Sequence, residues 1–246
     1  MKKSIQPNIW VGKGDVAKYA LLGGAPERIE KIASYLEKAE KVADHRGYVT
    51  YTGKFKGIEV SASCHGVGAP SASVVVEELA NVGVETFIRV GTTGAIQPGI
   101  NIGDLIIANA AVRDEGLTSK YVDIEYPAVA DGRVTNALIQ AAEKLDVKHH
   151  IGVVVTSDAF YASKWEHWNQ ANAISVEMEC SAVFILARMR KLKAGAILTV
   201  DGNIAEGTRK SEFGPGEKTG DIDERVVNGI EKEIEIALKA IELLES

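Results

Sequence analysis

The sequence predicts one α/β domain with a three-layer architecture, in which a central mixed β-sheet is flanked by helices. Short apolar runs alternate with amphipathic stretches, and several runs are too apolar to leave one face in water. A chain of 246 residues buries enough surface to fold without disulfides or a structural metal. No repeat, low-complexity tract or linker divides the sequence, so residues 1–246 are expected to form a single domain.

The expected strands are short runs rich in apolar and β-branched residues. Because several of them lack the alternation of a half-exposed strand, helices should cover both faces of the sheet. Tyr51 and Phe55 flank a hairpin expected at Gly53–Gly57, so the sheet should be mixed. The expected strands are Ala20–Leu22, Tyr48–Thr52, Ile58–Cys64, Thr86–Val90, Leu105–Val112, Ile151–Val155 and Ala194–Val200.

The expected helices lie between these runs. In the last one, Val226, Ile230, Ile234 and Leu238 recur at every fourth position among Glu and Lys residues, the pattern of a helix that packs on a sheet. Ala205–Gly220 is the one long irregular stretch, and a stretch of that length is usually a lid, a binding loop or disordered. The expected helices are Glu27–Leu36, Ser71–Val82, Asp131–Leu145, Cys180–Arg190 and Asp221–Glu245.

The composition argues against several classes of function. The chain has 28 Lys and Arg against 34 Asp and Glu, a net charge of −6, and no basic stripe that would bind a nucleic-acid backbone. Apolar runs such as Ala194–Val200 fall far short of the ~20 residues that span a bilayer. The N-terminus lacks the apolar core of a signal peptide, so a cytoplasmic location is expected. Cys64 and Cys180 are expected to be buried thiols, and no metal site is predicted.

Glycine-rich segments follow two expected strands, at the edge of the sheet where α/β proteins bind ligands. The segment Gly23–Arg28, GGAPER, follows the first strand, and Gly91–Gly94, GTTG, follows Thr86–Val90. Backbone amides, hydroxyls and the Arg28 guanidinium could together hold an anion, although each segment alone is compatible with a tight turn. Neither segment is a Walker A sequence, and no complete dinucleotide fingerprint is present, so ATP and NAD sites are not expected.

Charged residues stand out near the ends of other expected strands. Arg89 interrupts an apolar strand, and a buried guanidinium needs an anionic partner, either a bound anion or a core carboxylate such as Glu78. Asp201 directly follows a buried strand and is compatible with a proton donor of raised pKa or with a turn. Glu177 and Glu179 lie on one face if their segment is extended. Such a pair could accept hydrogen bonds from the vicinal hydroxyls of a sugar, or it could be a solvated or helix-N-terminal acidic pair.

Taken together, these segments resemble the nucleoside phosphorylase-I family, which contains hexameric purine nucleoside phosphorylases and uridine phosphorylases. The resemblance runs in consistent order from about residue 7 to residue 203. The matching pieces are GGAPER (23–28), HRGYVTYTGKFKG (45–57), SCHGVGAPSA (63–72), FIRVGTTGAIQPGINIGDLI (87–106), PAVAD (127–131), SDAFY (157–161), VEMECSA (176–182) and VDG (200–202).

The resemblance implies a role for each matching residue. It implies that phosphate is bound by Gly24, Arg28, Arg89, Thr92 and, from a neighbouring subunit, Arg46. It implies that the nucleoside is bound by Asn8, Thr93, Gly94, Phe160, Val176, Met178, Glu179 and Asp201. The implied catalytic residues are Asp201, Arg89 and Glu179. It further implies a homo-oligomer, a hexamer built from dimers that share their active sites, with phosphate as a co-substrate and no cofactor.

Three positions depart from the family's pattern. Asn8 stands where many members have a histidine that reaches the 5′ end of the ribose in the neighbouring subunit, but it can still hydrogen-bond a 5′-hydroxyl. Gly24-Ala25-Pro26 replaces the usual GDP. Bacterial hexameric purine enzymes carry the catalytic aspartate in the register of Gly202, whereas the VDG arrangement here is similar to that of the malarial-parasite purine nucleoside phosphorylase. Asp201 is therefore the expected acid.

The implied reaction is the reversible phosphorolysis of a purine ribonucleoside of the inosine or guanosine type, which yields the free base and ribose 1-phosphate and serves purine salvage. Uridine phosphorolysis is the alternative, because that branch resembles the GTTG segment. Its pyrimidine-reading Gln and Arg should follow Phe160-Tyr161, but residues 162–172 contain Gln170 and no Arg. A nucleosidase and a non-catalytic nucleoside-binding module are less favoured, because three arginines match phosphate-binding positions.

Overall fold

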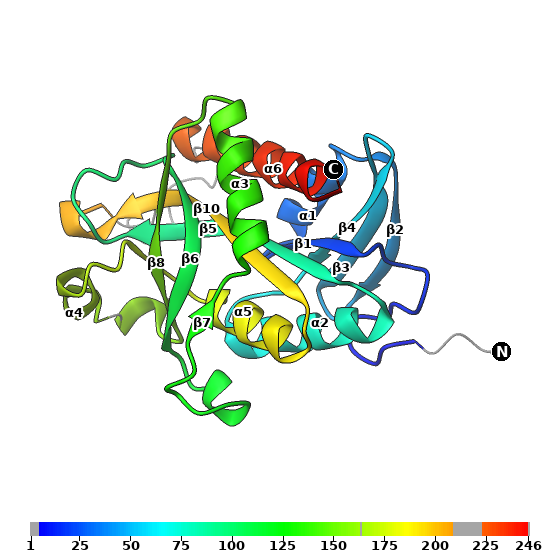
Figure 1. The fold of residues 1–246 in the computed structure, drawn as a ribbon, viewed down its shortest axis with the longest axis horizontal. Helices are drawn as coiled ribbons and strands as arrows, with labels where there is room; N and C mark the ends of the chain where they lie inside the picture. Colours follow the sequence, from blue (N-terminus) through cyan, green and yellow to red (C-terminus); the bar gives the residue numbers. More distant parts are fainter. Residues whose placement is uncertain (1–4, 163, 209–222, 246) are drawn as a thin grey trace, which may run out of the picture.

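The computed structural model of the chain describes residues 5–162, 164–208 and 223–245, and this part is an α/β fold (Figure 1). Its strands are β1 (Tyr19–Gly23), β2 (Glu37–His45), β3 (Tyr48–Phe55), β4 (Ile58–Cys64), β5 (Thr86–Ala95), β6 (Leu105–Asp114), β7 (Ala128–Val129), β8 (His149–Ser157), β9 (Ser175–Glu177) and β10 (Lys193–Asn203). Its α-helices are α1 (Pro26–Ala33), α2 (Ala69–Val82), α3 (Gly132–Lys144), α4 (Trp165–Gln170), α5 (Cys180–Met189) and α6 (Glu224–Glu245).

Half of the sheet closes on itself. β5 pairs in parallel with β10, β10 pairs antiparallel with β6, β6 pairs in parallel with β8, and the short β9 joins β8 back to β5. The remaining main strands extend from β5 in the order β1, β4, β3 and β2. The predicted mixed sheet is therefore confirmed. The predicted hairpin is the β3–β4 pair, whose turn places Lys56 and Gly57 at φ of 50° and 83°, the left-handed region that such short turns need.

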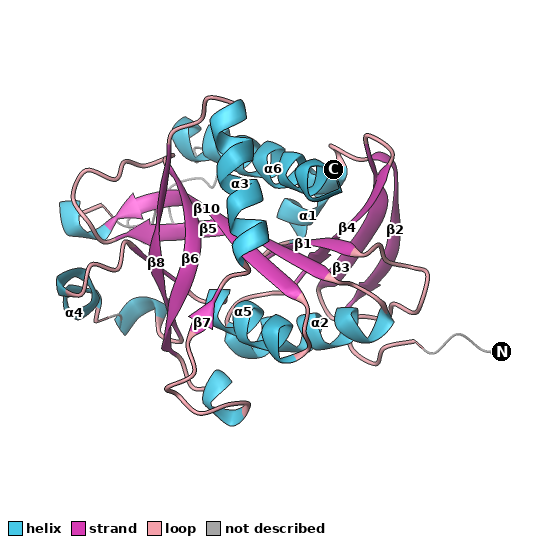
Figure 2. Cartoon of the chain, viewed as in Figure 1, coloured by secondary structure: helices cyan, strands magenta, loops and turns pink. Residues whose placement is uncertain are grey.

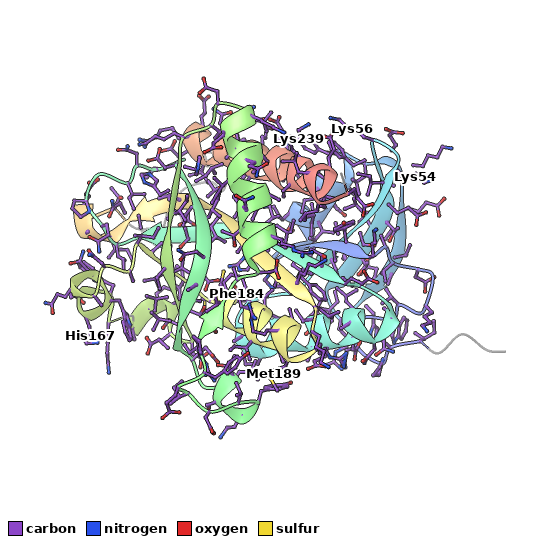
Figure 3. All side chains as sticks on the ribbon, viewed as in Figure 1. Lys54, Lys56, His167, Phe184, Met189 and Lys239 are labelled. Carbon is purple, nitrogen blue, oxygen red and sulfur yellow. The ribbon has the colours of Figure 1, made fainter. Side chains whose placement is uncertain are left out.

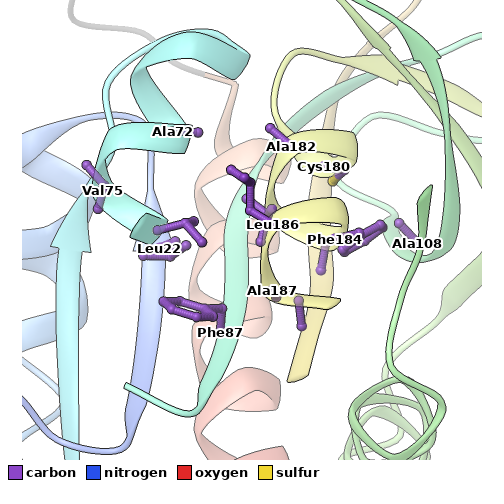
Figure 4. Packing of buried hydrophobic residues seen from close by; sticks show 14 of the residues in the cluster. Leu22, Ala72, Val75, Phe87, Ala108, Cys180, Ala182, Phe184, Leu186 and Ala187 are labelled. Atoms are coloured by element: carbon purple, nitrogen blue, oxygen red, sulfur yellow. The ribbon is translucent and has the colours of Figure 1, made fainter. Parts of the chain in front are cut away.

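Helices cover the sheet from two sides, as the three-layer prediction required (Figure 2). Helices α2 and α5 lie side by side on one face, and α1, α3 and α6 pack on the other. Figure 4 shows how small residues bring α2 and α5 together, with Ala72 facing Ala182 and Leu186 above Leu22 and Phe87 of the sheet. The core is thus divided into two main apolar clusters, one on each face.

The helix ends follow local chemistry. The carboxylate of Asp131 accepts hydrogen bonds from the backbone amides of Arg133 and Val134 and so caps the start of α3. Gly83 ends α2 in the left-handed conformation with φ of 116°. Helix α1 ends at Ala33, three residues before the expected end, because the chain turns there to begin β2. Helix α6 is described from Glu224 onward, and the expected residues 221–222 lie outside the described part.

Four elements were not expected from the sequence: β2, β7, β9 and α4. The nine residues of β2 include six charged ones, and the strand lies at the edge of the sheet, where only β3 pairs with it. Charged residues without an apolar face give no strand signal, so tertiary pairing decides this conformation. β7 and β9 span only two and three residues, too short for a periodic pattern. Of the irregular stretch 205–220, residues 209–220 lie outside the described part.

Charged side chains cover the outside of the molecule and apolar ones fill the inside (Figure 3). Phe184 of α5 is buried. Lys56 of the β3–β4 turn and Lys239 of α6 lie close together at the surface, where each contacts a carboxylate oxygen of Glu242 at 2.9 Å. Among the described residues, no helix is both long enough and apolar enough to cross a membrane.

Candidate active site

The expected site residues gather at the carboxyl ends of three neighbouring parallel strands, β1, β5 and β10. The register of the strands places Gly24 beside the part of β5 that follows Arg89, and it places Asp201 beside Gly94. Gly91–Gly94, expected to form a loop, belongs to β5 itself because it continues to pair with β10. β10 carries a bulge at Asp201, a feature that is frequent next to active sites.

Arg89 is buried at the centre of this site, and its side chain is only 5% exposed. Its Nε donates to Oε2 of Glu177 at 3.0 Å, and its Nη2 donates to Oε2 of Glu179 at 2.5 Å. Burial alone would lower the pKa of the guanidinium, but the two carboxylates outweigh burial and raise this pKa above its ordinary value. Glu78, the core carboxylate considered from the sequence, is not the partner of Arg89; it accepts hydrogen bonds from the N-terminal segment instead.

The remaining nitrogen of Arg89 faces the strand that holds the expected phosphate-binding residues. A Cβ atom added to Gly91 would lie 2.0 Å from Nη1, so the guanidinium folds back over the backbone of Gly91. Within the described ranges, Nη1 has no hydrogen-bond partner. Thr92, which follows Gly91, is half-buried. One face of the cation is therefore fixed by carboxylates, and one nitrogen is left for a ligand.

Glu177 is occupied by protein groups, so the expectation that both carboxylates of the pair could receive a sugar is wrong for this residue. Its two oxygens accept hydrogen bonds from Arg89, from Oγ1 of Thr156 at 2.5 Å, and from the backbone amides of Glu179 at 2.8 Å and Cys180 at 2.9 Å. Residues 175–177 are extended, but Glu179 is already the N-cap residue of α5. Glu177 thus positions Arg89 and the start of α5, a role that its spacing from Glu179 did not reveal.

Glu179 lies between the second glycine-rich turn and Arg89. Its Oε1 accepts a hydrogen bond from the backbone amide of Gly68 at 2.6 Å, while Oε2 accepts from Arg89. The residue is buried, and Met178 beside it is half-buried. A carboxylate held in this way at the site can accept a hydrogen bond from a substrate hydroxyl as well, because each oxygen has two lone pairs.

Arg28 enters the site from the first turn of α1. Its Nη1 donates to a carboxylate oxygen of Glu233 in α6, a residue that the sequence interpretation did not single out. Burial lowers the pKa of Arg28 to about 10, the neighbouring positive charge of Arg89 lowers it further, and Asp201 opposes the shift. Arg28, Arg89 and Asp201 are therefore close enough to interact electrostatically at the ends of the strands.

Three of the expected base-binding residues also lie together. Gly94 pairs with Val176 between β5 and β9, and Oγ1 of Thr93 donates to the carbonyl of Val176 at 2.9 Å. Phe160 lies in a short 3-10 turn after β8. Its ring is half-exposed and stacks edge-on against Tyr161, with the ring centroids 4.9 Å apart. The structure thus joins Thr93, Gly94 and Val176 and leaves Phe160 on a separate, exposed turn.

Arg46 and Asn8 lie away from the rest of the site and beside each other. Arg46 is exposed in the turn between β2 and β3. Two strands separate β2 from β1, a distance of roughly 14 Å at the usual strand spacing. The ring of His45 bonds the carbonyl of Asn8 at 2.8 Å, and the Asn8 amide donates to Glu78 at 2.6 Å. Trp10 stacks on His45 with 3.7 Å between the ring centroids, which fixes both segments.

His65 is a site residue that the sequence interpretation missed. It follows β4, and its ring lies against the phosphate-loop glycine: a Cβ on Gly24 would be 3.7 Å from Cε1 of His65. Its Nδ1 donates to the carbonyl of Gly66 at 2.8 Å, so the buried Nε2 is an unprotonated acceptor. A single buried histidine at the end of an apolar strand carries no spacing signal that would have marked it.

The described residues contain no group of three or more His, Cys, Asp or Glu side chains arranged to hold a metal ion. Cys64 and Cys180 are both buried and free, as expected. Burial, reinforced by the negative charge of Glu177, raises the pKa of Cys180 well above its ordinary value, so this thiol stays protonated. The chemistry of the site therefore falls to its arginines and carboxylates.

Residues 18–241 match the sequence model of the phosphorylase superfamily. A uridine phosphorylase of Thermococcus kodakarensis is 46% identical over 234 residues, which cover 88% of this chain and 83% of that protein. The chain belongs to the nucleoside phosphorylase family. A guanosine phosphorylase of Halorubrum lacusprofundi is 40% identical over 242 residues and covers 97% of this chain and 99% of its own length. The Escherichia coli uridine phosphorylase is 36% identical over 219 residues, with 81% and 87% covered.

Membership of the nucleoside phosphorylase family confirms the family and fold predicted from the sequence, and it makes the chain an enzyme of the pentosyltransferase type. The relatives differ in the base that their names give, uridine in two of these cases and guanosine in the third. Nucleoside phosphorylases act on a nucleoside and phosphate. The identity of the base is therefore the question that the family leaves open.

Proposed function

We propose that this enzyme catalyses the reversible phosphorolysis of purine ribonucleosides of the guanosine and inosine type, with phosphate bound at the carboxyl ends of β1 and β5. The observation that carries the proposal is the pair of arginines there. Arg28 and Arg89 interact electrostatically, each is held by a carboxylate, and Arg89 keeps Nη1 for a ligand. Two like charges held close together at a strand edge are stabilised by an anion placed between them.

In the proposed mechanism, phosphate is held by the backbone of Gly24, by the two arginines and by Thr92. Glu179 accepts hydrogen bonds from the 2′- and 3′-hydroxyls of the ribose and so fixes C1′ beside the phosphate. Cleavage of the glycosidic bond proceeds through an oxocarbenium-like transition state, which the nearby phosphate anion stabilises. Asp201 donates a proton toward N7 of the leaving purine. Thr93, Gly94, Val176 and Met178 line the nucleoside, with Phe160 at the rim.

The charges of the site support the further proposal that a neighbouring subunit completes it. In one chain, the carboxylates of Glu177, Glu179 and Glu233 face only the two guanidinium groups of Arg28 and Arg89. A phosphate dianion added to this set would leave uncompensated negative charge in a buried place. A third cation is therefore needed near the phosphate.

Arg46 is the proposed third cation, supplied by the partner of a dimer. It is exposed, and it lies too far along the sheet to serve the site of its own chain. Asn8 would reach the 5′-hydroxyl of the ribose from the same partner segment. Mixing Arg46→Ala protein with Glu179→Ala protein under conditions of subunit exchange should restore activity, because some mixed dimers contain one intact site. An active monomer in sedimentation experiments, or no recovery on mixing, would contradict the shared site.

Uridine phosphorolysis is the second candidate. The names of the relatives from Thermococcus kodakarensis and Escherichia coli favour it. The sequence after Tyr161 favours purines, because residues 162–172 contain no arginine to bind a pyrimidine. The guanosine phosphorylase of Halorubrum lacusprofundi also supports a purine, since it aligns over nearly its whole length.

Product analysis with guanosine, inosine and uridine, each with and without phosphate, tests the proposal. We expect guanine and hypoxanthine to be released only with phosphate, together with ribose 1-phosphate. Base release at an equal rate without phosphate would identify a nucleosidase. A higher kcat/KM for uridine than for guanosine would overturn the purine assignment, and tight binding without turnover would indicate a nucleoside-binding module.

A further inference from the structure

Helix α6 buries a carboxylate on its apolar face. Glu233 is 0% exposed. It lies among Val226, Ile230 and Ala237, the residues at helical spacing that face the sheet. Burying a carboxylate without partners costs several kcal/mol, so its position calls for a specific interaction. An amphipathic helix that only packed on the sheet would carry an apolar residue there.

Both oxygens of Glu233 are engaged at the site. Oε1 accepts from Nη1 of Arg28, and Oε2 accepts from Oγ1 of Thr199 at 2.7 Å. Thr199 lies in β10, two residues before Asp201, and pairs with Thr92 of β5. The carboxylate therefore connects the C-terminal helix with the arginine of the first loop and with the strand that ends at the expected acid.

The approach of α6 to β10 is close at this point because Gly229 has no side chain. A Cβ there would lie 2.5 Å from Cγ2 of Thr199 and 2.9 Å from the carbonyl oxygen of Gly103. Glu233 is one helical turn further along, on the same face. The distance between helix and strand is thus set by backbone contact, which fixes how far the carboxylate reaches toward Arg28.

Arg28 needs such an anchor. Its long side chain is 14% exposed, and the like charge of Arg89 repels it. Without a fixed partner, the guanidinium would gain by turning toward solvent, where it keeps its hydration and moves away from Arg89. One nitrogen bound to Glu233 leaves the others in place to bind a second anion from the opposite side.

We infer that Glu233 is a positioning residue for phosphate: it holds the Arg28 guanidinium at the strand ends and so makes helix α6 part of the phosphate site. The inference rests on the proposed function, since it assumes that Arg28 binds phosphate. It assigns Glu233 no contact with the substrate. Its effect should therefore appear in the binding of phosphate and not in the binding of the nucleoside.

Two substitutions separate aim from charge. Glu233→Asp keeps the charge but withdraws it by one methylene, about 1.5 Å, so the carboxylate cannot reach Arg28 and Thr199 together. Glu233→Gln keeps the length and an oxygen for Arg28 but removes the charge. Glu231→Gln is the matched control on the same helix, because Glu231 forms a half-exposed ion pair with Lys31 at 2.6 Å, away from the site.

The KM for phosphate and the KM for the nucleoside should be measured for each intact protein. For Glu233→Asp we expect the KM for phosphate to rise about 10-fold or more, because a shift of about 1 Å in a positioning group can cost two orders of magnitude. Glu233→Gln should stay within about 3-fold of wild type in this KM, and the nucleoside KM should change less than 2-fold in both. Glu231→Gln should match wild type throughout.

Several results would overturn the inference. A phosphate KM within 2-fold of wild type for Glu233→Asp would show that Glu233 is only structural, and a larger defect for Glu233→Gln than for Glu233→Asp would show that charge matters and aim does not. A parallel rise in both KM values would point to general loosening of the site. If Glu233→Asp does not fold, Thr199→Val, which frees Oε2, takes its place with an expected rise of about 3-fold. Wild-type turnover without phosphate would instead refute the proposed function.

Discussion

His65 should make the stability of this enzyme depend on pH in a way that one substitution removes. The ring is fully buried, its Nδ1 donates to the carbonyl of Gly66, and no described group bonds Nε2. Burial, reinforced by the positive charge of Arg89 and only partly opposed by Glu177, lowers the pKa of His65 from 6.5 to about 3. The folded protein therefore keeps this histidine neutral under conditions in which the unfolded chain protonates it.

The sign and size of the effect follow from linkage. Below pH 6.5 the unfolded state takes up a proton that the folded state refuses, so the free energy of unfolding falls as the pH drops from 6.5 toward 3. At pH 5 nearly every unfolded chain carries the proton and almost no folded one does. Between pH 7 and pH 5 the histidine should thus cost about 2 kcal/mol of stability.

Urea unfolding at pH 7 and pH 5 measures this effect in wild type and in His65→Asn. Asparagine keeps an amide donor for the carbonyl of Gly66 but does not titrate. The loss of stability between the two pH values should be about 2 kcal/mol smaller in the variant, while contributions from other groups cancel in the comparison. His167→Asn, in exposed helix α4 (Figure 3), should leave the pH dependence unchanged. Equal pH dependence in His65→Asn and wild type would refute the reasoning.

Three other substitutions test the site. Gly91→Ala places a Cβ 2.0 Å from Nη1 of Arg89 and so displaces the guanidinium; the phosphate KM should rise at least 10-fold, while Gly132→Ala, whose Cβ meets nothing within 4 Å, should not change it. Glu177→Gln removes one buried partner of Arg89 and should lower the free energy of unfolding in urea by about 3 kcal/mol; a change below 1 kcal/mol would contradict this role. Asp201→Asn should lower guanosine phosphorolysis about 10²–10⁴-fold and leave slow uridine turnover within a few-fold; an equal loss of both activities would mean that Asp201 is not the proton donor.

The elements that the sequence predicted well are those whose pattern is local. All seven expected strands and the hairpin turn are present, because apolar runs and a turn with two left-handed residues leave few other conformations. Strand β2 was not predicted, since its charged residues carry no periodic apolar face and its conformation depends on pairing with β3. The closure of half the sheet through β5 and β10 was not predicted either, because strand order is a long-range property.

The sequence by itself determined the fold class, the family and the places where chemistry could occur. GGAPER and GTTG follow expected strands, and the carboxyl ends of parallel strands meet at one edge. Only the tertiary structure decided how the charges are paired. Arg89 bonds Glu177 and Glu179, and Arg28 bonds Glu233 more than 200 residues away. A charged side chain has the same local pattern whichever partner it meets, and burial makes the choice costly to change, so strand register and helix packing assign each carboxylate its role.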